Sequence, residues 1–384
     1  MAPRRPPPPD SPAPTDGSAG AAAVLRRRLP RRLLDWFARR RRDLPWRRDR
    51  DPYRIWVSEV MLQQTQAATV VPYFERFLQA FPTLADLAAA DEQQVLRLWE
   101  GLGYYRRARD LLRTARLLAA SHGGRFPDDP AALDGLPGLG RYTRNAVLSQ
   151  AFDRRLPILE ANSRRVLCRL FGRTGDPSRA SEQRWLWDAA EALLPVRRVG
   201  DFNQALMELG ALVCTPDAPR CSECPLADDC AARRLGLQDA IPANTPRPEP
   251  TEVREAAVVV RRGEQVLLLQ RPAEGRWASM WEFPHAPLAA KESADEAAAR
   301  LLPELTGLEA RLGPELVTLR HGVTRFRITL VCFEAEYLSG DFHSPFYRQG
   351  VWLTPHELAA HPVSSPQRRL AAALADDGRP RRLF

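Results

Sequence analysis

CTPDAPRCSECPLADDC, which runs from Cys214 to Cys230, places four cysteines within seventeen residues, separated by gaps of six, two and five residues. The interleaved prolines prevent one continuous helix, so we expect a compact loop that brings the thiols together. Such a loop can hold a tetrahedral zinc ion or an iron–sulfur cluster, and two disulfides are a third arrangement. Cys168 and Cys332 stand alone and no secretion signal is visible, which disfavours a disulfide framework. The stretch therefore predicts a metal centre with four ligands: Cys214, Cys221, Cys224 and Cys230.

Length and charge bound the possible functions. The 384 residues are enough for two or three domains, and the net charge of +9 with a pI near 9.7 favours an anionic partner such as nucleic acid. No run of 18 apolar residues exists, so no membrane span is expected. Lys291 is the only lysine, so almost every cation is an arginine.

Composition changes along the chain predict its organisation. The tail at residues 1–23 is rich in Pro and Ala and is expected to be disordered, and the next helix is expected to start at Pro30. Residues 24–239 form the helical region, with apolar spacings of three and four from Asp51 onward and no strand alternation. The Pro-rich segment 240–255 is expected to be a linker. Residues 256–375 are expected to form a separate α+β domain, with strands at Ala256–Val260, Val266–Leu269 and Arg327–Phe333 and a helix at Ala294–Leu302.

The segment Leu136-Pro-Gly138-Leu-Gly140 lies between two helical stretches. Glycines two residues apart allow a tight turn and a close approach of the backbone to a ligand. The following helix is expected to start near Arg141, with its free N–H groups facing an anion such as a DNA phosphate. A plain helix–helix turn is the alternative interpretation.

The nonapeptide Ser58-Glu-Val-Met-Leu-Gln-Gln-Thr-Gln66 places Glu59 among apolar neighbours. Burial of a carboxylate raises its pKa, which would let Glu59 donate a proton near neutral pH. An exposed Glu on a polar helix face is the alternative.

Together these motifs resemble the endonuclease III and MutY group of DNA glycosylases. The 6-2-5 cysteine spacing is similar to a loop that holds a [4Fe–4S] cluster, Pro137-Gly138-x-Gly140 resembles a helix-hairpin-helix, and the nonapeptide resembles the MutY active-site helix. The resemblance implies a mainly α helix-hairpin-helix glycosylase fold followed by an α+β Nudix-like domain. It also implies that Glu59 protonates adenine at N7.

Further residues receive roles from the same resemblance. Gln64 and Tyr104, the latter in Gly101-Leu-Gly-Tyr-Tyr105, would enter the duplex. The adenine pocket would be lined by Arg42, Trp46 and Gln204. In the cluster loop, Arg220, Arg233 and Arg234 would contact phosphates.

Glu160 occupies the position of the family's catalytic Asp, and Ala161 that of the following Gly, with Asn162 in support. A carboxylate beneath C1′ stabilises the positive charge that develops on the sugar. The extra methylene of Glu changes the reach of that carboxylate, and misplacement on this scale costs about 10²-fold in rate unless the backbone compensates.

The family's DNA-nicking members use a lysine amine at the position of Tyr142. Because the helical region contains no lysine, a Schiff base at that position is not expected. The sequence therefore predicts a monofunctional glycosylase that uses water.

The C-terminal region resembles the Nudix-like domain of the MutY family through Trp281-Glu-Phe-Pro284. The helix Ala297–Leu305 has too few carboxylates for the Mg²⁺ site of a Nudix hydrolase, so we expect binding rather than hydrolysis. In the family this domain recognises 8-oxoguanine through a Phe-Ser-His loop, which aligns with Val323-Thr324-Arg325. Thr324 retains the hydroxyl. A simple β-hairpin is the alternative.

The sequence thus predicts a DNA glycosylase that releases adenine mispaired with 8-oxoguanine or guanine in double-stranded DNA. We expect a monomer with a [4Fe–4S] cluster, located in the bacterial cytoplasm near the nucleoid. A catalytically inactive mismatch-binding protein and an endonuclease III-like pyrimidine glycosylase are the alternatives.

Overall fold

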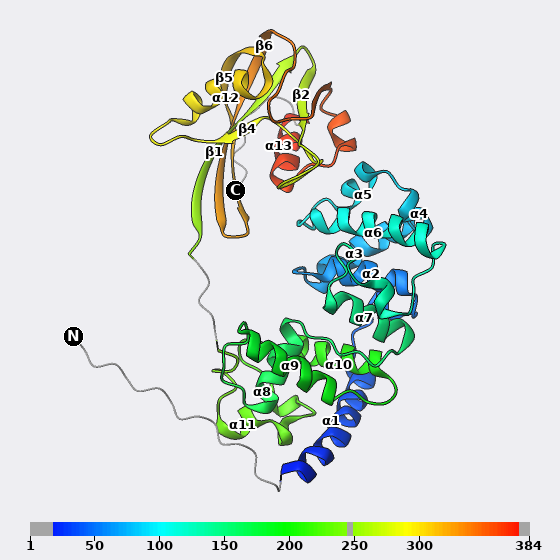
Figure 1. Cartoon of the computed structure of the whole chain (residues 1–384). Coiled ribbons are helices and arrows are strands. Elements are labelled where there is room, and N and C mark those ends of the chain that lie inside the picture. Colours follow the sequence, from blue (N-terminus) through cyan, green and yellow to red (C-terminus); the bar gives the residue numbers. More distant parts are fainter. Residues whose placement is uncertain (1–17, 244–248, 376–384) are drawn as a thin grey trace, which may run out of the picture. The chain divides into compact units, whose positions relative to one another are not determined.

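The computed structural model describes residues 18–243 and 249–375, which Figure 1 traces from blue to red. The described residues divide into two compact units. The first comprises residues 18–55, 128–133 and 141–243, and the second comprises residues 56–127, 134–140 and 249–375. Residues 1–17 of the predicted tail and residues 244–248 of the predicted linker lie outside the described residues.

Helices build the whole first unit. They pack around a core to which Phe37, Leu167 and Phe202 contribute fully buried side chains. The elements are α1 (Ser18–Arg40), η1 (Pro45–Arg47), η2 (Pro130–Leu133), α7 (Arg141–Phe152), α8 (Ala161–Phe171), α9 (Ala180–Ala192), α10 (Val199–Leu212), η3 (Cys221–Glu223), η4 (Ala227–Asp229) and α11 (Ala231–Leu235). Helix α2 (Pro52–Leu62) begins in this unit and ends in the second.

The predicted start of the first helix is wrong. Helix α1 begins at Ser18, so residues 18–23 are helical, and Pro30 lies inside the helix. The reason is packing: Leu29, Leu33 and Phe37, spaced by four residues across the proline, are each 2% exposed or less. Burial of this apolar stripe outweighs the one backbone hydrogen bond that a proline removes.

The helices of the second unit are α3 (Ala67–Ala80), α4 (Leu84–Ala89), α5 (Glu92–Trp99) and α6 (Arg106–His122). Helix α4 starts with a capping box, in which the Thr83 hydroxyl accepts from the Asp86 N–H and the Asp86 carboxylate accepts from the Thr83 N–H. Residues 51–239, all of which are described, contain helices and turns but no strand, as predicted. No helix in the described part of the chain is long and apolar enough to cross a bilayer.

A seven-stranded sheet completes the second unit, with the order β3-β2-β1-β6-β5 and with β4 paired to β1 and β7 paired to β2. Strands β1 and β6 run parallel, and every other pair is antiparallel. The elements are β1 (Thr251–Arg262), β2 (Gln265–Gln270), β3 (Trp281–Glu282), β4 (His285–Pro287), α12 (Ala294–Thr306), β5 (Glu309–Val323), β6 (Phe326–Ser339), β7 (Gln349–Leu353), η5 (Glu357–Ala360) and α13 (Ser365–Ala375).

Helices cover both faces of this sheet (Figure 1). Ala257 and Val259 of β1 belong to a core that includes Leu370 of α13, whereas Val258 belongs to a core that includes Leu301 of α12. Because both faces are buried, β1 carries a continuous apolar run rather than strict alternation. The three predicted strands and the predicted helix are confirmed.

The predicted linker at 240–255 is too long at its C-terminal end. Strand β1 already begins at Thr251, whose N–H donates to the Arg325 carbonyl at 2.8 Å. Polar residues at this end of β1 are exposed, so the apolar signal starts only at Ala256 although the ladder to β6 starts five residues earlier. The strand is therefore longer than its hydrophobic part.

His285 lies in a buried ionic network of the C-terminal domain. Its Nδ1 is 3.1 Å from Glu255 and its Nε2 is 3.2 Å from Glu282, and Glu282 also accepts from Arg271 at 2.6 Å and from the Tyr347 hydroxyl at 2.9 Å. Burial alone lowers the pKa of His285. The charge of Glu282 and the contacts with both carboxylates outweigh burial and raise the pKa to about 10.

A His285→Gln variant tests this network. Because the folded pKa of about 10 exceeds the unfolded value near 6.5, the stabilisation from charged His285 is complete below pH 6.5 and is lost as pH rises to 10. We expect the variant to unfold more easily than wild type by a few kcal/mol at pH 6, and this difference to shrink toward pH 10. Urea unfolding at pH 6, 8 and 10 measures it, and a pH-independent difference contradicts the assignment.

Candidate functional site

Glu59 lies in the middle of α2 and is only 4% exposed, between Ser58 and Val60, which are also buried. The exposed-face alternative is therefore wrong. The helix starts at Pro52, a residue suited to a first turn, and its buried positions include Trp56 and Met61. The predicted acid is therefore a buried carboxyl group.

Gln64 and Tyr104 each sit in a tight turn with a left-handed backbone. Gln64 follows α2 with φ 58°, and Tyr104 precedes α6 with φ 49°. Both side chains are exposed, Tyr104 to 48%. Left-handed φ values cost energy for residues other than glycine, and such strain concentrates at functional sites.

Arg107 holds the two turns together. Its Nη1 donates to the carbonyls of Val60, Met61 and Gln63 at 2.8, 3.0 and 2.5 Å, and its Nη2 donates to Leu102 and Gly103 at 3.2 and 3.3 Å. Its guanidinium also lies 5.5 Å from the Tyr104 ring centroid. Burial lowers the pKa of Arg107 to about 10. One half-buried cation therefore fixes the backbone next to both exposed side chains.

Glu160 caps helix α8. Its Oε2 accepts from the Asn162 N–H at 2.7 Å and its Oε1 from the Ser163 N–H at 2.6 Å, while the Ser163 hydroxyl accepts from the Glu160 N–H at 2.8 Å. This is a capping box with the carboxylate at the first position. The longer side chain thus folds back on its own helix, whose N-terminus favours a negative charge.

A hydrogen-bonded chain connects Glu160 to the cysteine loop. Asn162 donates from Nδ2 to Glu160 at 3.2 Å and accepts from Arg165 at 2.8 Å. Arg165 in turn donates to the carbonyls of Gly210 at 2.8 Å and Cys214 at 2.7 Å. A Cβ at Gly210 would stand 2.6 Å from the Asn162 Cβ, so only glycine allows α10 to approach α8 this closely.

The four predicted ligands share one loop that starts where α10 ends. Electrostatic interactions link Cys224 with Cys214, Cys221 and Cys230, and all four are free thiols. Arg169 donates to the Cys214 sulfur at 3.4 Å. Within the described residues, no group of three or more His, Cys, Asp or Glu side chains is arranged to hold a metal ion. The donor set itself, four thiols beside a buried cation, fits a group held by thiolates.

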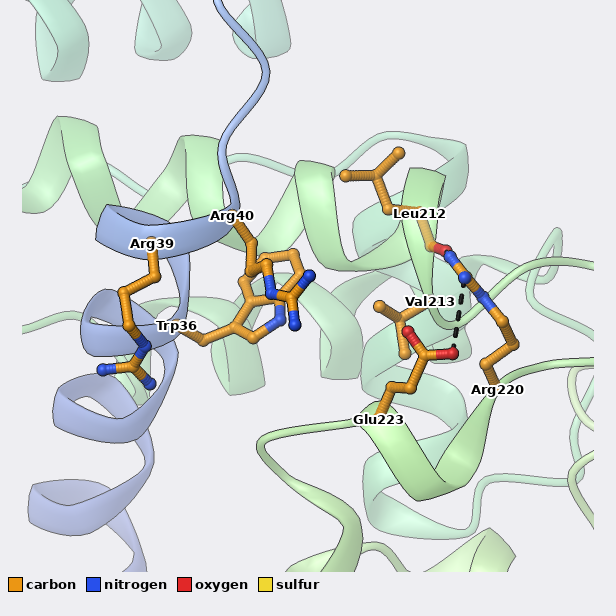
Figure 2. Close-up of a pocket in the computed structure, with 7 residues that line it drawn as sticks. All are labelled: Trp36, Arg39, Arg40, Leu212, Val213, Arg220 and Glu223. Carbon is orange, nitrogen blue, oxygen red and sulfur yellow. Dashed lines mark hydrogen bonds and ion pairs between the residues drawn. The ribbon is translucent and has the colours of Figure 1, made fainter.

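A hollow of about 390 Å³ lies between the end of α1 and the cysteine loop, as Figure 2 shows. Arg220 is fixed at its rim, because it donates to the Leu212 carbonyl and pairs with Glu223 at 3.4 Å. Arg233 lies 3.8 Å from Asp228. The hollow is lined by Trp36, Arg39, Arg40, Leu212, Val213, Arg220 and Glu223.

Arg42 points toward Glu208 of α10. Glu208 is 1% exposed and accepts from Arg42 at 3.0 and 2.7 Å and from Arg47 at 3.1 and 3.0 Å. Burial alone raises the pKa of Glu208, but the two arginines outweigh it and lower the pKa to about 2. Trp46 is buried in η1 and Gln204 is half-buried on α10. The three residues predicted to line a base pocket thus belong to the first unit.

Of the two glycines predicted to turn the hairpin before α7, only Gly138 has a left-handed backbone. Gly138 has φ 71°, and the Thr114 hydroxyl donates to the Pro137 carbonyl at 2.7 Å. Gly140 has no left-handed φ, and a Cβ there would meet no atom within 4 Å. Its predicted role in turning the chain is wrong, although the open space allows a ligand to approach. Helix α7 begins at Arg141 as predicted.

Tyr142 and Thr324, two further residues predicted to contact DNA, each make a hydrogen bond through their hydroxyl group. Tyr142, in the first turn of α7, donates its hydroxyl hydrogen to the Met207 sulfur at 3.3 Å. Thr324 lies in the two-residue turn between β5 and β6, is exposed, and donates its hydroxyl hydrogen to the Val323 carbonyl at 2.7 Å. The segment is a β-hairpin, and its turn leaves the Thr324 side chain accessible.

Three carboxylates in and just before α12 have partners on the same segment of chain. Glu296 caps the helix with Ser293, and Glu292 and Glu304 both pair with Arg300, at 2.7 and 2.8 Å. These carboxylates are therefore engaged in ion pairs and a cap.

Sequence reasoning missed Arg107, Arg165, Gly210 and Glu208. Each acts through contacts with residues distant in sequence, and a single sequence carries no signal for such pairings. Of these four, only Gly210 could have been noticed in the sequence, because an isolated glycine inside a helical pattern often marks a close contact with another element.

The comparisons agree with this architecture. The model for HhH-GPD superfamily base excision DNA repair proteins matches residues 57–191, and the NUDIX domain model matches residues 256–373. A solved structure of a thermostable thymine-DNA glycosylase superposes with a TM-score of 0.52 at 31% identity, over 56% of this chain and 99% of that one. Fold and site define a protein of the base excision DNA repair class.

Named relatives narrow the class. The adenine DNA glycosylase of Rattus norvegicus is 40% identical over 67% of this chain and 60% of its own length. That of Buchnera aphidicola subsp. Schizaphis graminum is 35% identical over 66% of this chain and 73% of its own length. The chain belongs to the adenine DNA glycosylase family. It spans less than two thirds of the mammalian relatives that it matches.

Glu208→Gln tests the buried arginine clamp. Loss of the carboxylate leaves Arg42 and Arg47 unpaired, so we expect the free energy of unfolding at pH 7 to fall by about 3 kcal/mol. Because the folded pKa of about 2 lies below the unfolded value of 4.5, the advantage of wild type is complete above pH 4.5 and disappears as pH falls toward 2. Urea unfolding from pH 7 to 3 measures it. Glu182→Gln, which leaves only Arg173 unpaired, is the control and should lose less.

Gly210→Ala tests the approach of α10 to α8. The added methyl must displace Asn162, and through it Glu160, so we expect the NMR signals of both residues to shift relative to wild type. Unchanged signals would mean that the approach of α10 does not set the position of Asn162.

Proposed function

We propose that this chain hydrolyses the N-glycosidic bond of adenine mispaired with 8-oxoguanine or guanine in double-stranded DNA. The observation that carries the proposal is Glu160, a carboxylate fixed by two N–H groups at the start of α8 and supported by Asn162. Membership in the adenine DNA glycosylase family supports the choice of base.

Glu59 acts as the acid. Adenine must leave the stack before a side chain can reach it, and the flipped base then sits in a protein pocket. Glu59 protonates N7, so the electrons of the bond between C1′ and N9 pass to a ring that leaves as neutral adenine. The side chain is 4% exposed, so the proton transfer takes place where little solvent reaches it.

Glu160 stabilises the cation that remains. Loss of adenine leaves positive charge on C1′ and the ring oxygen, and a nearby carboxylate lowers the energy of this state. Water then adds to C1′, and its proton passes to the Glu59 carboxylate, which regenerates the acid. Because no lysine occurs in the helical region, we propose that the reaction ends at the abasic site without strand cleavage.

Gln64 and Tyr104 hold the duplex open in this proposal. Both are exposed on turns that Arg107 fixes, so they present rigid wedges. The free N–H groups at the start of α7, next to the open space at Gly140, contact a backbone phosphate and position the duplex. Arg42, Trp46 and Gln204 contribute to the adenine pocket.

Cys214, Cys221, Cys224 and Cys230 are proposed to hold a [4Fe–4S] cluster through four thiolates. With all ligands from protein, such a cluster supplies a fixed cross-link rather than an open reaction site. Arg169 then stabilises the negative charge of the thiolates, while Arg165 connects the loop to Asn162.

Thr324 is proposed to contact the base opposite adenine. Its exposed hydroxyl on the β5–β6 turn offers both a donor and an acceptor. Since the carboxylates of α12 are paired, the C-terminal domain binds DNA in this proposal and does not hydrolyse nucleotides.

Single-turnover adenine release from duplexes with adenine opposite 8-oxoguanine, guanine or cytosine tests the function. We expect wild type to act fastest opposite 8-oxoguanine, and Glu59→Gln to lose about 10²–10⁴-fold as expected for a general acid. Glu160→Asp reports whether the longer carboxylate is adapted to its backbone. Borohydride reduction during the reaction should trap no protein–DNA adduct.

Tight mismatch binding by wild type without adenine release would support the inactive mismatch-binding alternative. Release of an oxidised pyrimidine with a trapped adduct would support the endonuclease III-like alternative.

A further inference from the structure

The loop that carries Tyr104 is held at both ends by the C-terminal domain, within the second compact unit. At its N-terminal end, Glu100 accepts from Arg368 of α13 at 2.7 and 2.9 Å, and from the Val363 N–H at 3.4 Å. At its C-terminal end, the hydroxyl of the buried Tyr105 donates to the Val363 carbonyl at 3.4 Å. Only four residues, Gly101–Tyr104, lie between the two anchors.

One face of α5 forms the rest of this contact. Gln93, Arg97 and Glu100 are spaced by four and three residues and therefore project from one side of the helix. The Trp281 indole donates to Gln93 at 2.8 Å, and Arg97 donates to the Ala359 carbonyl at 2.7 Å. Trp281 is 5% exposed and belongs to the core of the C-terminal domain, so Gln93 is bonded to a rigidly held side chain.

Arg368 is the centre of this interface. Besides its two bonds to Glu100, it donates to the carbonyls of Leu358 and His361 at 2.9 and 2.7 Å. A guanidinium held by four hydrogen bonds has little rotational freedom, so it fixes the carboxylate that it binds. The Glu100 side chain is 9% exposed, which protects the pair from water and salt.

The loop itself needs such an anchor. Gly101, Gly103 and Tyr104 have φ values of 99°, 69° and 49°, conformations that persist only where the surroundings impose them. Arg107 binds the middle of the loop by donating to the carbonyls of Leu102 and Gly103. Glu100 fixes the N-terminal end of the loop, and Arg368 holds Glu100 through two hydrogen bonds.

We infer that Arg368 is a positioning residue for base extrusion: through Glu100 it sets the place of Tyr104, so the C-terminal domain controls the wedge that opens the duplex. This inference rests on the proposed function, in which Tyr104 enters the DNA. It gives Trp281 and Gln93 a role in docking the domain to α5, distinct from any contact with the opposite base at Thr324.

The test compares wild type, Arg368→Gln, Glu100→Gln and the double variant on two duplexes. In the first duplex, adenine forms a base pair with 8-oxoguanine. In the second duplex, adenine lies opposite a tetrahydrofuran abasic analogue and forms no base pair. A wedge matters most where a pair must open. We expect each single variant to slow release from the paired duplex about tenfold, the double variant to be no slower than the singles, and release of unpaired adenine to change much less.

Arg300→Gln is the matched control, because Arg300 lies in the same domain and makes similar ion pairs, but with Glu292 and Glu304 rather than with Glu100. Amide hydrogen exchange of residues 100–105 in the full chain gives a readout independent of catalysis. Exchange there should rise about tenfold in Arg368→Gln and Glu100→Gln and stay unchanged in Arg300→Gln.

Equal slowing on both duplexes, additive losses, or unchanged exchange at residues 100–105 would each overturn the inference. Absence of adenine release by wild type would instead defeat the proposed function, and the exchange result would still decide whether Arg368 positions the loop.

Discussion

The proposed chemistry depends on one constraint, the fixed position of the Glu160 carboxylate at the N-terminus of α8. Two backbone N–H groups and the Asn162 amide hold it, and Arg165 holds Asn162 against the end of α10. That arrangement exists only because α10 has a glycine at position 210, where any Cβ would collide with Asn162. A missing side chain on one helix thus determines the place of a charged side chain on another.

Several arginine side chains connect separate elements through hydrogen bonds from their guanidinium groups. Arg107, Arg165 and Arg169 each donate to two or more backbone carbonyls from distant segments. Arg368 donates to two nearby carbonyls and to the distant Glu100 carboxylate. A guanidinium has five donors in a rigid plane and suits this task, whereas an ammonium group does not. The net charge of +9 therefore overstates the charge available to DNA, since several cations are buried among carbonyls. Exposed arginines such as Arg39 and Arg40 remain on the surface.

Local patterns predicted the local structure. The apolar surroundings of Glu59, the hairpin ahead of Arg141 and the strands from Ala256 onward follow from composition within about ten residues. Errors arose where distant packing overrides a local rule. Pro30 signals a helix start, yet burial of Leu29 and Phe37 carries α1 through it. The residues that hold the site, such as Arg107 and Gly210, were missed because their partners lie 40 to 50 residues away, as with the Gln63 and Asn162 contacts.

The capping geometry also bears on the replacement of Asp by Glu at position 160. Short side chains cap helices well because they reach the N–H groups without bending back. Glu160 has one more methylene and reaches Asn162 and Ser163 with separate oxygens, which spreads the carboxylate across the first turn. A carboxylate offers about four acceptor sites, and the N–H groups and the Asn162 amide use three. One site remains for a cation, so the longer side chain keeps the capacity to stabilise charge while its position is set by the helix. The backbone of α8, rather than the length of the side chain, then decides where that charge lies.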